Sequence, residues 1–190
     1  MLHRFTPYYP NPPDPDIPLW DCEDCNIRSR YKDNVYNGEY LGWGSRPTWG
    51  ESRALIRFDE PVGDPELITG GTMKHNWGLI HNYTGEPYKH LAFYRITQDW
   101  DETTTTWNTR PSTSQNPLHT YYIRIPPEPT GSPYYFEMSG DAVRAAFAHG
   151  IMIQAYPEAW IGECFVETRS KEFDLKYNKT IRPRIYITVD

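Results

Sequence analysis

The sequence lacks several features that would assign it to common classes of protein. No apolar run approaches the roughly 18 residues of a membrane-spanning helix. The first twenty residues, MLHRFTPYYPNPPDPDIPLW, contain no apolar stretch of signal-peptide length. With 19 Lys and Arg against 25 Asp and Glu, the net charge of −6 gives no general attraction for nucleic acid. We therefore predict no membrane insertion, no nucleic-acid partner, and no signal peptide in this numbering.

Aliphatic residues are also scarce, since Leu, Ile, Val and Phe together make up 35 of the 190 residues. So low a fraction is typical of disordered chains. However, 7 Trp and 15 Tyr supply large side chains and the net charge is small for the length, whereas disordered chains are poor in aromatics and rich in charge. The 18 Pro and 13 Gly recur along the whole chain, so few windows can hold a long helix. The composition predicts a folded, mostly extended chain with an aromatic core.

Cysteine is nearly absent, with Cys22, Cys25 and Cys164 as the three examples. The Cys22-Glu-Asp-Cys25 spacing raises zinc and redox alternatives, but the six histidines show no pairing that would complete a four-ligand zinc site. We favour a local disulfide or two free buried thiols, and predict no structural metal there. Calcium stays open as an alternative, with oxygens from Asp21, Glu23 and Asp24.

Residues 1–20 form a segment distinct from the rest of the chain. Six of the prolines lie here, which excludes a helix or a central strand and favours a polyproline-like arm. A free terminus is the ordinary alternative. The large apolar side chains favour an arm that docks on a neighbouring protein subunit, through Phe5, Tyr8, Tyr9 and Trp20.

Residues 21–190 show the alternation of an antiparallel β-sandwich. Short runs with apolar residues at every second position, such as 54–58, 121–125, 151–154 and 185–189, are separated by Gly, Pro, Asn and Asp clusters. One helix is predicted at about 140–149, because Ser139 offers an N-cap and Gly150 a stop. Val143 and Phe147, four residues apart, are expected to face the sheet together.

The segment 100–111, WDETTTTWNTRP, resembles the W-x-E-x-T-V-T-W-N-x-R-P motif of DNRLRE-type domains, also known as carbohydrate-binding module family 96. Further blocks resemble that family in the same order: 24–29, 34–38, 53–59, 92–97, 136–150 and 182–185. The resemblance runs from about residue 21 to residue 190. It implies a jelly-roll-like β-sandwich, often tethered to exported enzymes or cell-surface proteins, that binds polysaccharide without cleaving it.

The motif itself is predicted to be structural. Thr103, Thr105 and Trp107 would share one face of a strand with Trp107 buried, and Arg110 would pair with Asp101 or Glu102. Glycoside hydrolysis needs two carboxyl groups about 5–10 Å apart on opposite sides of a sugar, and Asp99, Asp101 and Glu102 fall in one turn. The chain also contains no G-x-S-x-G, H-E-x-x-H or phosphate-loop motif. We therefore predict that the protein is not an enzyme.

Carbohydrate-binding candidates are aromatic side chains next to planar polar groups. The Gly-bracketed segment 40–50 contains Tyr40, Trp43, Arg46 and Trp49, and we single out Trp43 and Trp49 as the stacking pair. Trp77 is the second candidate, and Tyr156 with Trp160 the third. Core packing is the alternative for each of them.

These features favour a non-catalytic carbohydrate-binding sandwich displayed on a larger assembly, such as a decoration, fibre or tail protein on a phage or virus surface. The expected location is a virion or an extracellular surface. One alternative is a purely structural assembly subunit that binds no glycan. The other is a secreted polysaccharide-binding module of an exported enzyme system.

Overall fold

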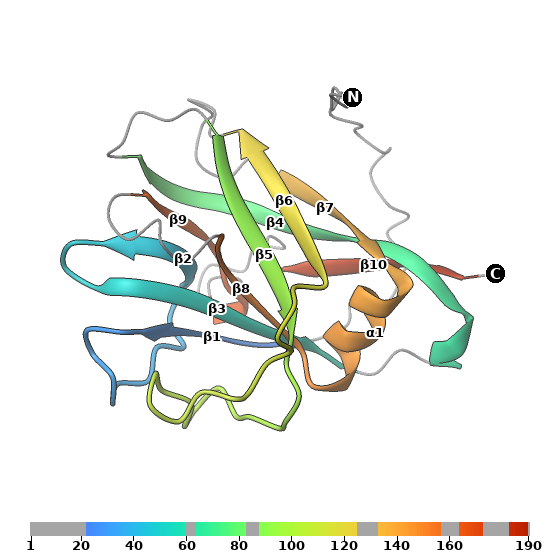
Figure 1. Ribbon diagram of the computed structural model, residues 1–190, viewed down its shortest axis with the longest axis horizontal. Coiled ribbons are helices and arrows are strands. Elements are labelled where there is room, and N and C mark those ends of the chain that lie inside the picture. The colour runs from blue at the N-terminus through green and yellow to red at the C-terminus, as the bar shows by residue number, and fades with distance from the viewer. Residues whose placement is uncertain are drawn as a thin grey trace.

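The computed structural model describes residues 22–59, 64–82, 88–124, 133–156, 164–172 and 183–189 (Figure 1). Within these ranges the chain forms antiparallel strands, one α-helix and one 3₁₀ turn: β1 (Cys22–Arg28), β2 (Tyr40–Arg46), β3 (Gly50–Phe58), η1 (Pro65–Leu67), β4 (Ile68–Asn82), β5 (Tyr88–Arg95), β6 (His119–Arg124), β7 (Pro133–Ser139), α1 (Gly140–Ala148), β8 (Ile151–Ala155), β9 (Cys164–Arg169) and β10 (Arg184–Val189). The expected all-β sandwich with one short helix is confirmed. No helix among the described residues is long and apolar enough to cross a membrane.

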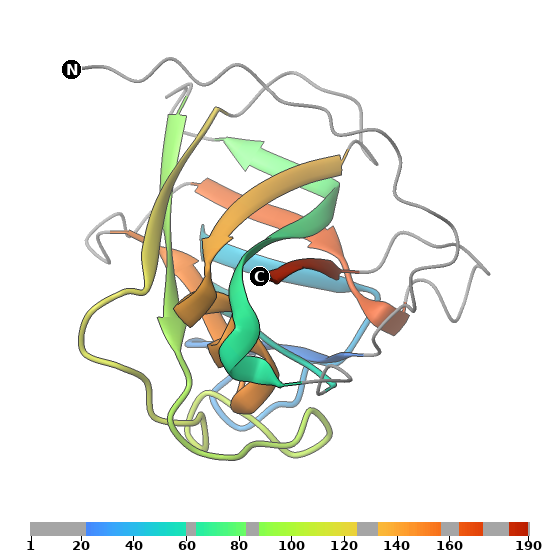
Figure 2. The same ribbon diagram turned by 90° about the vertical axis from the view of Figure 1, so that its right-hand side faces the viewer.

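Strand β4 links the two sheets of the sandwich. Its first part lies between β10 and β7, with Gly70 paired to both Thr188 and Ser139. Its last part, from Trp77 to Asn82, pairs instead with β9. From β9 the order continues through β2, β3, β8, β5 and β6, and β1 pairs with β3. Figures 1 and 2 show these strands curling around a shared interior, with α1 beside β4.

The main core lies between the sheets and under α1. The inward residues of β3, Ala54, Ile56 and Phe58, pack there with aliphatic and aromatic residues of β5, β8 and α1. The helix begins where Ser139 Oγ accepts a hydrogen bond from the Ala142 N–H at 3.3 Å, as an N-cap does. It ends before Gly150, whose φ of +95° favours glycine. The predicted helix is therefore confirmed, and Val143 and Phe147 are both buried in this core.

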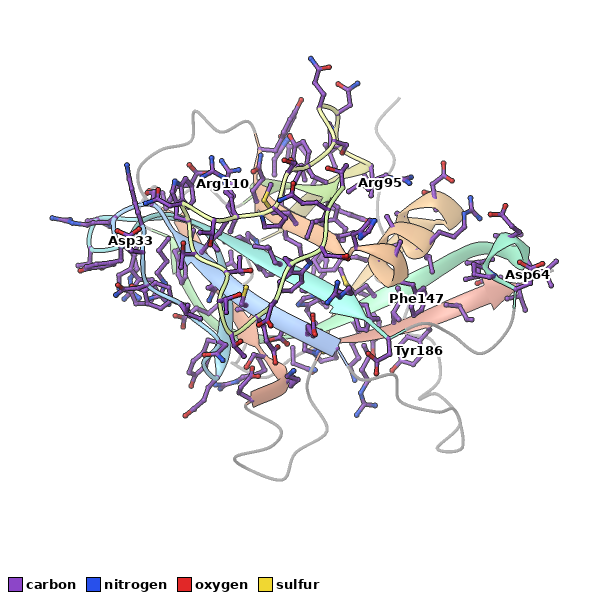
Figure 3. All side chains as sticks on the ribbon, turned by 90° about the horizontal axis from the view of Figure 1, so that it is seen from below. Asp33, Asp64, Arg95, Arg110, Phe147 and Tyr186 are labelled. Carbon is purple, nitrogen blue, oxygen red and sulfur yellow. The ribbon has the colours of Figure 1, made fainter. Side chains whose placement is uncertain are left out.

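The tryptophan motif forms a loop and not a strand, which corrects the sequence-based prediction. Asp101 Oδ1 accepts hydrogen bonds from the Thr103 N–H at 2.6 Å and from the Thr103 hydroxyl at 2.5 Å. These local bonds replace strand pairing, as short polar side chains often do in turns. Figure 3 shows this loop crossing over β1 and β3. It covers a second, smaller core made of Cys25, Ile27, Leu55, Ile96, Trp100 and Met152.

Trp100 and not Trp107 is the buried tryptophan of the motif. Trp100 is 7% exposed and its Nε1–H donates to the His149 carbonyl at 2.7 Å. Trp107 is half-buried at the edge of the second core, so the prediction of its full burial was wrong. Arg110 pairs with neither Asp101 nor Glu102. It lies 4.7 Å above the Trp107 ring and donates to the Trp107 carbonyl at 2.6 Å.

Cys22 and Cys25 are free, buried thiols. Successive strand residues point to opposite faces, so Cys22 enters the main core and Cys25 the second core. The same alternation separates Glu23, which pairs with Arg57, from the buried Asp24. These two carboxylates therefore do not converge on one calcium position, and Asp21 lies outside the described residues. Within the described ranges, no three His, Cys, Asp or Glu side chains are grouped to hold a metal ion.

Candidate functional site

A cluster of arginines and aromatic rings lies where β1, β2, β3 and β9 meet. Strand β1 ends with Arg28, and Tyr36 lies in the segment between β1 and β2. The β2–β3 hairpin contributes Tyr40, Arg46 and Trp49. Strand β9 adds three alternate residues of one face. We call this set the arginine–aromatic cluster: Arg28, Tyr36, Tyr40, Arg46, Trp49, Phe165, Glu167 and Arg169.

The tight β2–β3 turn places Arg46 next to Trp49. The Arg46 carbonyl accepts from the Trp49 N–H at 3.1 Å, and Arg46 pairs with Gly50 across the hairpin. Gly50 has a φ of +70°, a conformation that glycine adopts without strain. A side chain at this position would also meet Ser29 Oγ at 2.4 Å. Ser29 holds the hairpin to the end of β1, because its Oγ accepts from the Glu51 N–H at 2.8 Å.

Cations and rings alternate through the centre of the cluster. The Arg28 guanidinium lies 4.0 Å from the centre of the Tyr36 ring and 3.7 Å from that of Trp49. Arg46 lies 4.3 Å from the Trp49 ring, whose edge meets Phe165 at 5.1 Å between centroids. At the rim, Arg169 lies 4.6 Å above Tyr40. Each such contact is worth about 0.5–1 kcal/mol at an exposed site, so together they hold the guanidinium groups in fixed positions.

The cluster carries an excess of positive charge. Glu167 is the one carboxylate in it, and it interacts with Arg46, Arg28 and Arg169. Burial raises the pKa of Glu167, and these three cations act in the opposite direction. Burial also lowers the pKa of Arg28. No carboxylate of the described residues forms an ion pair with Arg28 or Arg46. Two guanidinium groups thus lack a full counter-charge within that part of the chain.

The family model of carbohydrate-binding module family 96 matches residues 20–138. The chain belongs to this family. No curated protein matches the sequence. The matched range includes β1 and the whole β2–β3 hairpin, so most of the arginine–aromatic cluster lies on the family's own segment. Strand β9, with Phe165, Glu167 and Arg169, completes the cluster from outside the matched range.

In this family 96 module, Trp43 lies apart from the other residues of segment 40–50 that were predicted to bind carbohydrate. Trp43 is 2% exposed and packs in the main core, with its ring edge-on to His75 at 5.9 Å. It lies on the inward face of β2, opposite Val166 of β9. A buried ring offers no face to a sugar, so Trp43 is a core residue and not part of a stacking pair.

Three of the other residues predicted to bind carbohydrate lie together in the cluster, and the remaining ones do not. Tyr40, which is 37% exposed, and the half-buried Arg46 and Trp49 come together in the cluster. Trp77 pairs through its backbone with Thr168 of β9, and its side chain lies outside the described part of the structure. Tyr156 lies at the end of β8, where its N–H donates to the His90 carbonyl. Trp160 is outside the described residues.

Five cluster residues were not predicted from the sequence of the module: Arg28, Tyr36, Phe165, Glu167 and Arg169. Arg28 was in a recognised strand, but its orientation depends on the pairing of β1 with β3, where it faces Ser52. The β9 residues reach the site through pairing with β2, more than a hundred residues earlier in the chain. An alternating Phe-x-Glu-x-Arg run next to an aromatic hairpin was the available signal.

Gly42 gives the first testable prediction, because it leaves room for the ring that supports Trp49. A Cβ atom at Gly42 would lie 2.2 Å from Cζ of Phe165, which is fully buried. Gly42→Ala should therefore destabilise the module by about 1–3 kcal/mol, as overpacking does. Urea unfolding measures this change. Gly38→Ala is the matched control, since nothing lies within 4 Å of its Cβ position, and it should stay within about 0.5 kcal/mol of the parent. Equal stabilities of the two variants would contradict the proposed packing.

Proposed function

We propose that the arginine–aromatic cluster binds a glycan that carries carboxylate or sulfate groups. The observation that supports this is the pair Arg28 and Arg46, which flank the Trp49 ring and have no ion pair among the described residues. Guanidinium groups recognise carboxylates and related oxyanions through two parallel hydrogen bonds. Aromatic rings at the same place suit the apolar face of a sugar. The combination fits an acidic sugar better than a neutral one.

The cluster is suited to a ligand that arrives on a partly exposed surface. Tyr40 at the rim is exposed, while Trp49 and Arg46 are half-buried and fixed by their contacts. Fixed side chains lose little rotamer entropy on binding, so more of the interaction energy appears as affinity. The proposed contacts are therefore Tyr40, Arg46 and Trp49, with Arg28 and Arg169 supplying charge behind them.

Affinity electrophoresis of the full chain tests the ligand class. Gels containing polygalacturonate, chondroitin sulfate or neutral dextran compare carboxylated, sulfated and uncharged polymers. We expect retardation by an acidic polymer, weakened by added salt because exposed charges are screened. Equal retardation by dextran would contradict the charge-based preference, and no retardation in any gel would contradict glycan binding by this cluster.

We also propose that the module binds without turnover. Glu167 is the one carboxylate among the described residues of the cluster, and its neighbours are arginines. Either form of glycoside hydrolysis uses two carboxyl groups. We therefore expect no new reducing ends when the protein is incubated with any polysaccharide that it retains. Reducing ends that disappear in Glu167→Gln would overturn this proposal.

We infer further that the module is displayed on the surface of a larger assembly, such as a virion, and is joined to it by the arm of residues 1–20. The composition of that arm supports this, since six prolines and several large apolar residues suit docking more than a free tail. The arm, with Phe5, Tyr8, Tyr9 and Trp20, lies outside the described residues. Purification from the native source decides the matter, because a decoration or tail protein sediments with particles and a secreted module does not.

A further inference from the structure

Three segments far apart in the sequence meet at Asp24 of β1, whose side chain is 0% exposed. Asp24 Oδ2 accepts from the Lys171 N–H at 2.9 Å, in the turn that follows β9. The Asp24 N–H donates to Glu102 Oε2 at 3.0 Å, in the motif loop. Lys171 Nζ closes the ring by donating to Glu102 Oε1 at 2.7 Å. We call these residues, together with Glu172, the β1–β9 clasp.

Two oxygens of the clasp have no donor within the described part of the chain. Asp24 Oδ1 and Glu172 Oε2 are both buried, and no hydrogen-bond donor of the described residues reaches either one. The Asp24 and Glu172 carboxyl groups interact with each other, and the Lys171 N–H that Asp24 binds belongs to the residue next to Glu172. Two carboxylate oxygens repel, whereas a carboxylic acid donates to a carboxylate. A buried charge without a partner costs several kcal/mol, so the bare pair is unfavourable when both groups are ionised.

The charges around the pair do not neutralise it. The groups that act on Asp24 and Glu172 are Glu102 from the motif loop and Lys171 from the turn after β9. Cys22 of β1 approaches through its Sγ, 3.7 Å from Asp24 Oδ2, and Cys25 interacts with Asp24 and Glu102. Glu23 interacts with Cys25 and is paired with Arg57 of β3. Among the described residues, three carboxyl groups therefore share one ammonium group, which Glu102 already binds.

The pKa values of these groups are shifted in the directions that an excess of carboxyl groups over ammonium groups predicts. Burial, and then the nearby Glu172, raises the pKa of Asp24 well above its ordinary value. Burial likewise raises the pKa of Glu172. Burial alone would lower the pKa of Lys171, but the hydrogen bond and charge of Glu102 raise it, so the ammonium stays protonated.

We propose that Asp24 and Glu172 share one proton, and that this proton fastens the end of β9 to β1 and the motif loop. The proton lies between Asp24 Oδ1 and Glu172 Oε2 and supplies the donor that both oxygens lack. Losing it leaves two buried carboxylates side by side and loosens the clasp. The clasp is a feature of the fold and does not depend on which glycan the module binds.

The sign of the resulting pH dependence follows from linkage. A carboxyl group with a raised pKa in the folded state binds its proton more tightly there than in the unfolded chain. Its stabilisation is complete below the ordinary carboxyl pKa, and it is lost as the pH rises through the raised folded-state pKa. The clasp should therefore be strongest in mild acid and weaker at neutral and basic pH.

Amide substitutions test the shared proton, because they fix a donor in its place. In Asp24→Asn the amide nitrogen can take the place of Asp24 Oδ1 and donate to Glu172, while the amide oxygen takes the place of Oδ2 and accepts from the Lys171 N–H. In Glu172→Gln the amide donates to Asp24. We expect both variants of the full chain to have a higher Tm than the parent above neutral pH. The difference in Tm between each variant and the parent should become smaller as the pH falls. Each tenfold difference in proton affinity corresponds to a Tm change of about 3–5 °C for a chain of this size. Glu66→Gln, which replaces an exposed carboxylate of η1, is the matched control. Its difference in Tm from the parent should stay constant with pH.

Two further measurements can overturn the proposal. Carbon-13 NMR of the parent should show one carboxyl resonance of this pair titrating above the ordinary range, and this readout does not require either variant to fold. Ordinary titration of both groups, or Tm gaps that do not change with pH, would exclude a shared proton. Calcium chloride should leave the Tm of the parent unchanged. A rise in Tm with calcium that Glu172→Gln abolishes would mean that a cation, and not a proton, holds the pair.

Discussion

Removing one guanidinium from the arginine–aromatic cluster should weaken binding to an acidic glycan by tenfold or more. Arg46→Gln keeps a polar side chain but shortens it and removes the charge beside Trp49. A charge-assisted hydrogen bond contributes about 1.5–3 kcal/mol, which corresponds to roughly 10- to 150-fold in Kd. Trp49→Ala should have an effect of at least this size, because it removes the ring between Arg28 and Arg46. Isothermal titration with whichever acidic polymer retards the parent measures both losses.

Arg110→Gln is the matched control for this experiment. Arg110 also lies over a tryptophan, at 4.7 Å from the Trp107 ring, but on the motif loop (Figure 3). Its loss should leave glycan affinity unchanged. Arg46→Lys separates charge from geometry, because lysine keeps the charge and loses the planar fork, so we expect intermediate affinity. If Arg46→Gln and Arg110→Gln bind alike, the cluster is not the binding site.

Deleting residues 2–19 should leave a folded sandwich that no longer joins its assembly. Burial of Phe5, Tyr8, Tyr9 and Trp20, at about 25 cal/mol per Å² and roughly 150–200 Å² each, corresponds to a gross gain on the order of 15 kcal/mol. A polyproline-like segment loses little chain entropy on docking, so much of that gain would remain. Co-sedimentation of the truncated chain with particles from the native source measures the loss.

A second arm variant separates side chains from backbone. Substituting Phe5, Tyr8, Tyr9 and Trp20 with serine keeps the prolines and should abolish assembly as completely as the deletion. Unchanged Tm in both variants would show that the sandwich itself is intact. If both variants assemble as well as the parent, the arm is a passive tail and the display proposal fails.

Local patterns in the sequence predicted the elements of this fold well. Ser139 and Gly150 marked the two ends of α1, and the alternation at Ala54, Ile56 and Phe58 identified a strand with one inward face. These signals act over a few residues, so they do not depend on how distant strands pair. The motif loop was misassigned because Asp101 forms hydrogen bonds within its own turn, and alternating threonines alone do not reveal that competition.

The candidate site was predicted only in part, because it depends on pairing between distant strands. Trp43 and Trp49 lie in one short segment, yet the hairpin turns one into the core and the other towards the arginines. Nothing local distinguishes them. Arg169 reaches Tyr40 only because β9 pairs with β2, and that register cannot be read from either strand alone.

The clasp offers a reason for the glutamate in the family motif. Glu102 is the third residue of WDETTTTWNTRP, and its two oxygens bind the Asp24 backbone and the Lys171 ammonium. It thereby joins the motif loop to β1 and to the turn after β9. The tryptophan before it, Trp100, fills the second core and binds the carbonyl of His149 just after α1. The motif therefore connects parts of the fold and does not itself contribute to the arginine–aromatic cluster.

The pairing of strand β4 with both sheets has a consequence for how the module unfolds. Its first part holds β10 and β7 together, and its last part is the neighbour of β9. Neither sheet can open without disturbing a strand that the other needs. The backbone amides of β4 should then exchange with solvent only when the whole sandwich opens, as those of the most stable cooperative unit do. A pull applied to one end of such a module should therefore reach the arginine–aromatic cluster through a single rigid body.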